Sequence, residues 1–463
     1  MDLNSFQILT GELEALIRNV KGRELTSQSN QSTIVRLSRR IESCDPLSVI
    51  STSTLSPYSY WRGRDGSIEI AGIGAADRLT CQDPSQLHSV FKKIDASLSR
   101  SSPSVRYFGG TRFNSRSSIS EEWQEFGVAQ FILPRIEVIQ QGGSYYLVAN
   151  LLTEQEVKPQ IANLEEILAG FKSSETSNAT RVLSNRFDTP SKARWNEIIR
   201  EVLACLEGSD IAKKIVLSRT TKFKLNTAPK PAYLLKELLK ISPLSYGFIF
   251  SPTPGIAFLG ASPERLYHRR NQSLASEALA GTTGRGSNQE HDRILADDLL
   301  NSRKNRTEHR LVIESISQQL SKISLKEPTI DQTTTIRTGS VQHLYAGIRS
   351  EINPDISDYD IIEKLHPTPA VAGTPTELAQ EFINQHEGYD RGWYSGPFGA
   401  LGKEESEFAV AIRSALINKD SINLFVGAGI VSGSDERSEW QEIEAKMAPY
   451  LKLIGGELFD EQF

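Results

Sequence analysis

Cysteine and long apolar segments are both scarce in this chain of 463 residues. The three cysteines, Cys44, Cys81 and Cys205, lie far apart with no CxxC spacing, which excludes a zinc site or a disulfide framework and is typical of a reducing compartment. No apolar run approaches the roughly 20 residues that span a bilayer. The first residues also lack the basic and apolar segments of a secretory signal, so we expect a cytoplasmic protein without membrane contact.

An excess of charge of one sign is missing as well. The net charge is −5, and the 38% hydrophobic and 24% charged residues form an ordinary globular composition. Such a balance gives no general attraction to nucleic acid, so we expect no nucleic-acid partner. The seven histidines show no metal-ligand spacing, and no GxxxxGK[ST] loop and no Ser/His/Asp or Cys/His nucleophile arrangement is present.

The order of the predicted elements indicates an α+β fold with large antiparallel sheets. We expect strands at 67–74, 131–138, 145–150, 214–219, 246–250, 256–259, 408–417 and 422–426, and helices over about 195–208, 292–323 and 436–454. Hairpins and long helical excursions without regular βαβ alternation favour antiparallel pairing. Pro134 predicts a sheet edge or a bulge, and the polar segment 173–180 predicts a linker.

Lys214 begins a segment, 214–219, that reads as a buried strand. Burying an ammonium costs free energy unless it pairs with a carboxylate or loses its proton, and a lysine that is neutral near pH 7 can act as a general base. Taken alone, a solvated amine at a strand end is the commoner outcome. Because neighbouring residues face opposite sides of a strand, the pattern does not decide whether Lys213 or Lys214 points inward.

A turn of small residues and a proline, 260–266, would hold Glu264 in place after a buried strand. A fixed, partly buried carboxyl can have a raised pKa and act as a general acid, whereas a turn carboxylate paired with Arg265 is the simpler interpretation. The glycine-rich segment 280–286 offers backbone amides to an anion. Taken alone, it is better explained as a flexible loop.

Two expected helices carry glutamates that could bind a magnesium ion. Glu308 lies on the first, and Glu439, Glu442 and Lys446 on the second are spaced i, i+3 and i+7, so they share one face. Magnesium usually takes one or two protein carboxylates together with water and substrate oxygens. One glutamate from each helix would suit it, although a solvated acidic face is the alternative.

The segment around Arg413 could bind an anionic ligand. On the expected strand, Arg413 shares a face with three alanines, which leaves space for a ligand whose carboxylate would match the guanidinium. The glycine-rich segment 427–429 adds free amides, and a structural ion pair of Arg413 is an equal alternative. The proline-rich segment 366–375 can be neither helix nor central strand and predicts a rigid loop, a frequent place for site residues.

Together these segments resemble the chorismate-utilising enzymes related to anthranilate synthase component I, and among them the isochorismate synthases. The resemblance covers roughly residue 192 to the C-terminus, and its blocks follow in order: 214–219, 260–264, 279–282, 307–309, 342–344, 366–373, 394–396, 412–413, 427–430 and 439–446. It implies an α+β fold of large antiparallel sheets packed face to face with helices on the outside. Residues 1–190 would form a variable β-rich part of the same globular unit, and 191–463 the catalytic region.

The resemblance also implies roles for individual residues. Lys214 would deprotonate the water that attacks C2 of chorismate, and Glu264 would protonate the departing C4 hydroxyl. Glu308 and Glu442 would bind Mg²⁺, with Glu439 close by. The implied substrate-binding positions are Gly281, Thr282, His343, Ala370, Tyr394, Arg413, Gly427, Gly429 and Lys446.

The implied function is the reversible, Mg²⁺-dependent isomerisation of chorismate to isochorismate by a monomeric enzyme without a redox cofactor, for menaquinone or phylloquinone synthesis. Lys214 favours water over ammonia as the nucleophile, and Ala370 argues against aminodeoxychorismate synthase, which often carries a lysine there. A salicylate synthase, which goes on to eliminate pyruvate, and a non-catalytic chorismate-binding protein are the alternatives. The chain departs from some relatives at Asn305, where a carboxylate is common.

Overall fold

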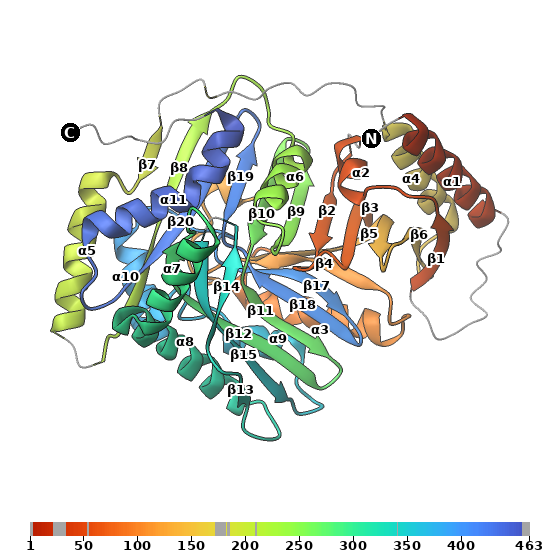
Figure 1. The fold of residues 1–463 in the computed structure, drawn as a ribbon. Coiled ribbons are helices and arrows are strands. Elements are labelled where there is room, and N and C mark those ends of the chain that lie inside the picture. Colours follow the sequence, from red (N-terminus) through yellow and green to blue (C-terminus); the bar gives the residue numbers. More distant parts are fainter. Residues whose placement is uncertain are drawn as a thin grey trace.

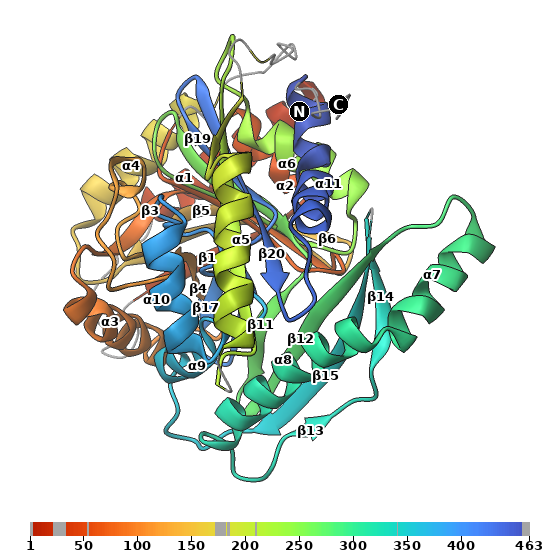
Figure 2. The same cartoon turned by 90° about the vertical axis from the view of Figure 1, so that its left-hand side faces the viewer.

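The computed structural model describes residues 3–21, 34–52, 55–171, 182, 186–208, 211–339 and 341–455. Within these ranges the chain forms twenty strands and eleven α-helices (Figures 1 and 2). The helices are α1 (Leu3–Lys21), α2 (Pro46–Thr52), α3 (Leu87–Ser99), α4 (Val157–Gly170), α5 (Lys192–Glu207), α6 (Pro231–Ile241), α7 (Gln289–Asn301), α8 (Arg303–Ser321), α9 (Asp358–Leu365), α10 (Thr376–His386) and α11 (Glu436–Ile454). None of these described helices combines the length and apolar composition needed to cross a membrane.

The strands are β1 (Ile34–Ile41), β2 (Tyr58–Arg62), β3 (Ile68–Cys81), β4 (Arg106–Thr111), β5 (Ala129–Gln141), β6 (Ser144–Leu152), β7 (Phe187–Thr189), β8 (Lys214–Lys224), β9 (Tyr246–Thr253), β10 (Ile256–Ser262), β11 (Arg265–Arg270), β12 (Ser273–Gly284), β13 (Thr329–Ile330), β14 (Thr334–Thr338), β15 (Val341–Glu351), β16 (Gly373–Thr374), β17 (Pro397–Gly402), β18 (Glu405–Val410), β19 (Ser414–Asn418) and β20 (Ser421–Ile430). The linker predicted at 173–180 lies outside the described residues.

All pairings among these strands are antiparallel, and they form two long stretches that meet at β5. One stretch runs β1–β6–β5–β3–β2–β9–β10–β19–β20–β8, with β7 and β16 on β8. The other runs β5–β4–β17–β18–β11–β12–β15, with β13 and β14 on β15. Strands β2 and β4 of the N-terminal part therefore pair directly with β9 and β17 of the C-terminal part.

Pro134 lies where β5 changes partners. Residues 129–132 of β5 pair with β4 and residues 136–141 pair with β6. Proline has no N–H to donate at the change-over, and the opposite strand β3 shifts register between Ala75 and Asp77. The predicted bulge is confirmed, on the strand that faces the proline.

An aromatic core separates the two stretches and shows that they pack face to face. Buried side chains from both meet in it, including Trp61, Phe108, Phe248, Phe258 and Phe398. The outer faces bury apolar side chains against helices: α1, α2, α4, α5, α6 and α11 cover one, and α3, α8 and α9 cover the other (Figures 1 and 2). The expected α+β architecture with helices outside is confirmed.

Three local predictions were wrong. The strand expected over 408–417 is divided into β18 and β19, because the backbone turns at Arg413 with φ 51°. The helix expected over 292–323 is divided into α7 and α8 at Ser302, whose hydroxyl accepts a hydrogen bond from the Asn305 amide and caps α8. The glycine-rich segment predicted as a flexible loop continues β12 up to Gly284, with an irregularity between Ala280 and Thr282.

Candidate active site

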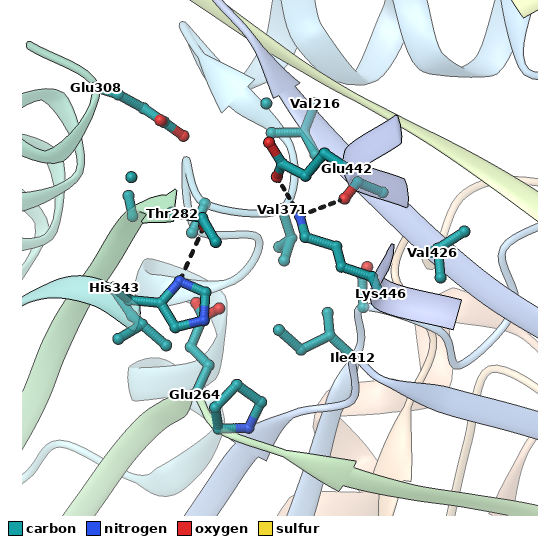
Figure 3. A pocket seen from close by; sticks show the side chains of 18 of the residues that line it. Val216, Glu264, Thr282, Glu308, His343, Val371, Ile412, Val426, Glu442 and Lys446 are labelled. Carbon is teal, nitrogen blue, oxygen red and sulfur yellow. Dashed lines mark hydrogen bonds and ion pairs between the residues drawn. The ribbon is translucent and has the colours of Figure 1, made fainter. Parts of the chain in front are cut away.

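A cavity lies where the ends of β8, β20 and α11 approach β12, β15 and α8 (Figure 3). All fourteen site residues expected from the sequence line it: Lys214, Glu264, Gly281, Thr282, Glu308, His343, Ala370, Tyr394, Arg413, Gly427, Gly429, Glu439, Glu442 and Lys446. They come from segments that lie far apart in the sequence. Figure 3 shows Glu308 and Glu442 in its upper part and Glu264 in its lower part, so carboxyl groups lie on both sides of the cavity.

The ammonium of Lys214 points into the cavity and meets a carboxylate there. Lys214 is only 1% exposed, whereas Lys213 is exposed, which decides the choice that strand geometry left open. The Lys214 Nζ lies 2.8 Å from Glu308 Oε1 on α8. The interpretation of Lys214 as a solvated strand-end residue is therefore wrong. The cost of burying its ammonium is offset by the ion pair with Glu308.

Backbone hydrogen bonds fix the turn that carries Glu264. The Glu264 amide donates to Ser262 Oγ at 3.2 Å, and its carbonyl accepts from the Val410 amide at 3.1 Å. The carboxyl group is buried and accepts a long hydrogen bond from Thr368 Oγ1 at 3.4 Å. Burial, aided by the negative charge of Glu277, raises the pKa of Glu264 to about 8, although the Lys214 ammonium opposes it. A carboxyl group that holds its proton at neutral pH can act as a general acid.

Each of the three glutamates expected near a metal is paired with a lysine. Besides Lys214–Glu308, Lys446 Nζ lies 2.6 Å from Glu442 Oε1 and Lys304 Nζ lies 3.1 Å from Glu439 Oε1. Burial opposes ionisation of Glu442, but the charges of Lys446, Lys304 and Arg413 together outweigh it and lower the pKa of Glu442.

The three carboxylates line the same cavity, and two of them affect each other. Burial, followed by the charge of Glu442, raises the pKa of Glu439. Among the described residues no group of three His, Cys, Asp or Glu side chains stands close enough to bind one ion.

Another part of the cavity wall, the cationic wall, carries Arg413 and Tyr394. Arg413 stands in a left-handed backbone conformation, and Tyr450 OH donates a 2.8 Å hydrogen bond to its carbonyl. Within the described part of the chain, no hydrogen bond or ion pair engages its guanidinium, and burial lowers its pKa. Tyr394 stacks on Phe425 with ring centroids 5.2 Å apart. Arg413 therefore faces the cavity as expected, but from a break between strands rather than from a face of small residues.

His343 and Thr282 form a neutral pair at the base of the cavity. Thr282 Oγ1 lies 2.9 Å from His343 Nδ1 across the β12–β15 pairing (Figure 3). Burial, and then the charge of Arg413, lowers the pKa of His343 well below its usual value, so the imidazole is neutral. Next to them, Gly281 has φ 79°, and a Cβ there would lie 3.1 Å from the Asn305 Cβ, so α8 packs closely on this irregularity.

Sequence reasoning missed a buried arginine that supports the cavity from behind. Arg391 donates hydrogen bonds to the carbonyl oxygens of Val371 at 2.8 Å and Val216 at 2.9 Å, both of which line the cavity. Its charge is matched by Glu387, whose carboxylate also accepts from the Ser218 amide. No local pattern marks Arg391, because its partners lie on other elements. Lys304 was not expected in the site either, although it stands four residues before Glu308 on the same helix face.

Comparisons with known proteins agree with this architecture. The family model described as chorismate binding enzyme matches residues 17–455. The chain is 33% identical over 397 residues to isochorismate synthase 2, chloroplastic, of Arabidopsis thaliana, covering 84% of this chain and 70% of that protein. It is 31% identical over 451 residues to isochorismate synthase MenF of Escherichia coli (strain K12), covering 97% and 99%.

Solved structures show the same relationship. The structure of MenF, the menaquinone-specific isochorismate synthase from Escherichia coli, matches with a TM-score of 0.84 at 29% identity, covering 96% of this chain and 99% of that one. Anthranilate synthase component I from Streptococcus pneumoniae TIGR4 matches with a TM-score of 0.65 at 18% identity, covering 87% and 91%, which is a likeness of fold. Sequence, fold and cavity agree, and the chain belongs to the family of chorismate binding enzymes.

Proposed function

We propose that this protein is an isochorismate synthase, an isomerase that exchanges the C4 hydroxyl of chorismate for a hydroxyl at C2. The observation that carries the proposal is the placement of Lys214 and Glu264 in one cavity, with Glu264 holding its proton near neutral pH. Relatives named isochorismate synthase at about 30% identity over most of the chain support it.

In the proposed reaction the two residues handle two separate protons. Lys214, once its amine is neutral, takes a proton from a water molecule as the oxygen bonds to C2. The ring double bonds shift, the C4–oxygen bond breaks, and Glu264 gives its proton to the leaving hydroxyl, which departs as water. One water enters and one leaves, so no oxidant or reductant is needed.

The residues present fit a magnesium ion, which we propose as the cofactor. Glu308 and Glu442, with Glu439 nearby, offer carboxylate oxygens into one cavity, and magnesium needs only one or two such ligands beside water and substrate oxygens. When bound, the ion would offset the charge of the substrate's ring carboxylate. Each glutamate is paired with a lysine through its Oε1, so the ion would either displace the lysine or use the second carboxylate oxygen.

The cationic wall supplies the proposed grip on the second carboxylate of the substrate. The Arg413 guanidinium lines the cavity with no hydrogen-bond or ion-pair partner among the described residues, and a guanidinium matches a carboxylate in bidentate geometry. Tyr394 stands beside it, and the backbone at Gly427 and Gly429 lets the substrate approach. On the other wall Gly281, Thr282 and His343 would contact the ring carboxylate side, and Ala370 would border the ring.

Lys214→Gln tests the assignment. The variant should lose isochorismate formation by a factor on the order of 10²–10⁴, as expected when a general base is removed, while retaining its fold and binding of Mg²⁺. The matched control is Lys213→Gln, since Lys213 neighbours Lys214 but is exposed. Products formed from chorismate and Mg²⁺ are identified by mass spectrometry; salicylate with pyruvate would favour a salicylate synthase, and binding without turnover a non-catalytic protein.

We further propose that the enzyme acts as a monomer in the cytoplasm and supplies menaquinone or phylloquinone synthesis. All three cysteines lie in the described ranges and none joins another in a disulfide, which suits a reducing compartment. The menaquinone-specific enzyme that matches over nearly its whole length supports the pathway.

We also propose that residues 1–190 and 191–463 are parts of one globular unit, because β2 and β4 of the first part pair with β9 and β17 of the second. Light scattering tests the monomer, and quinone content after gene deletion tests the pathway.

A further inference from the structure

A second buried carboxylate lies behind the turn that carries Glu264. Glu277 on β12 is 1% exposed and does not line the cavity. Its Oε1 accepts a 2.8 Å hydrogen bond from the amide of Arg265, the residue after Glu264, and it forms an ion pair with Arg64. Its Oε2 is buried without a hydrogen-bond partner in the described part of the chain. A buried carboxylate oxygen without a partner costs free energy, so the presence of Glu277 at this position calls for a physical reason.

Arg64 reaches this carboxylate from the N-terminal part of the chain. It lies in the turn between β2 and β3, and its guanidinium stands 5.0 Å from the centre of the Tyr246 ring. The side chain is 14% exposed, so the ion pair is largely shielded from water. Burial opposes the charge of Arg64, but Glu277, Tyr246 and Tyr345 together outweigh it and raise the pKa of Arg64, so the arginine is charged where it meets the Glu277 carboxylate.

Several other charged and titratable groups surround Glu277, Arg64 and Glu264. Arg265 pairs with Glu407 of β18 at 3.2 Å, and Tyr246 of β9 donates to Glu407 at 2.9 Å. Burial raises the pKa of Tyr345 on β15, and the charges of Glu277, Arg64, Arg265 and Asp331 also act on it. Around Glu264 itself stand Lys214, Thr368, Arg64 and Glu277, and only Glu277 acts with burial to favour the protonated form.

We propose that Glu277, which is paired with Arg64 and holds the Arg265 amide, is a positioning residue for the acid Glu264. It anchors the peptide bond between Glu264 and Arg265, and its negative charge keeps the neighbouring carboxyl group in the proton-donating form. The N-terminal part would thus contribute to the acid step through a charge that never touches the substrate. The inference rests on the proposed function, because it assigns a purpose to the proton on Glu264.

Glu277→Gln tests this directly, since glutamine keeps an oxygen for the Arg265 amide and removes the charge. Activity should be lost at high pH as Glu264 ionises, so we expect the basic limb of the kcat/KM profile to move toward lower pH by about one unit, with the acidic limb unmoved. A purely structural role would lower kcat at every pH and leave the limb in place. Glu407→Gln is the matched control: it removes a carboxylate of the same cluster that is not among the main causes of the raised pKa of Glu264, so the limb should stay.

A second measurement does not depend on turnover. The infrared band of the protonated carboxyl group that Glu264→Gln removes can be titrated, and its midpoint should fall in Glu277→Gln. If the unpaired Arg64 prevents folding, the double variant Arg64→Met/Glu277→Gln removes both charges and should shift the midpoint in the same direction by less. An unchanged midpoint in the folded variants overturns the inference, whereas failure of the wild-type protein to form isochorismate overturns only the proposed function.

Discussion

Replacing Gly429 by alanine should impair the proposed base while leaving the fold intact. Gly429 lies on β20, opposite Val216 of β8. A Cβ built at Gly429 would lie 2.7 Å from Lys214 Cε, 2.8 Å from Glu308 Oε1 and 3.1 Å from Lys214 Nζ. The new methyl group would therefore meet both partners of the buried ion pair at once.

The size of the effect follows from the overlap. Ordinary contact begins at 3.4 Å, so Lys214 Cε must move by about 0.7 Å. A misplacement on the order of 1 Å can cost a factor of about 10² in rate, so we expect kcat to fall by roughly 10- to 100-fold. Overpacking lowers the free energy of unfolding by about 1–3 kcal/mol. We expect a loss near the lower value here, because the far end of a lysine side chain can shift.

The assay is the rate of isochorismate formation from chorismate at saturating Mg²⁺, together with the midpoint of thermal unfolding. Gly284→Ala is the matched control, because a Cβ there meets nothing within 4 Å and the residue also lies on a strand. An unchanged kcat in Gly429→Ala, with the control equally active, would refute the argument that Lys214 must occupy its observed position.

Three further outcomes are expected. Burial raises the pKa of Glu264 from 4.5 to about 8, so the carboxyl group destabilises the fold as pH rises through this window, and Glu264→Gln should unfold at higher denaturant than the wild type at pH 8 but not at pH 4 while losing turnover. Glu308→Ala should weaken Mg²⁺ binding in calorimetry and abolish activity, and full activity in excess chelator would contradict the metal role. Arg391→Lys loses the hydrogen bonds to the carbonyls of Val216 and Val371, so we expect unfolding free energy to fall by about 2 kcal/mol and KM for chorismate to rise.

Much of the site could be predicted because its chemistry is carried by short segments. The i, i+3 and i+7 spacing of Glu439, Glu442 and Lys446 places them on one face of any helix, and α11 presents that face to the cavity. Backbone strain was harder to foresee. The alternation around Arg413 predicts one continuous strand, and nothing local indicates the left-handed residue that divides β18 from β19.

The sequence by itself determined the residue types of the site and several of its elements: the buried strand at Lys214, the helix with Glu439 and Glu442, the tight turn at Glu264 and the order of the segments that mark the family. Only the tertiary structure decided which lysine faces inward, that Lys214 pairs with Glu308 94 positions away, and that Glu277 and Arg64 stand behind the acid. The physical reason is that local patterns encode periodicity and turn geometry, whereas burial and charge compensation depend on side chains that only folding brings together.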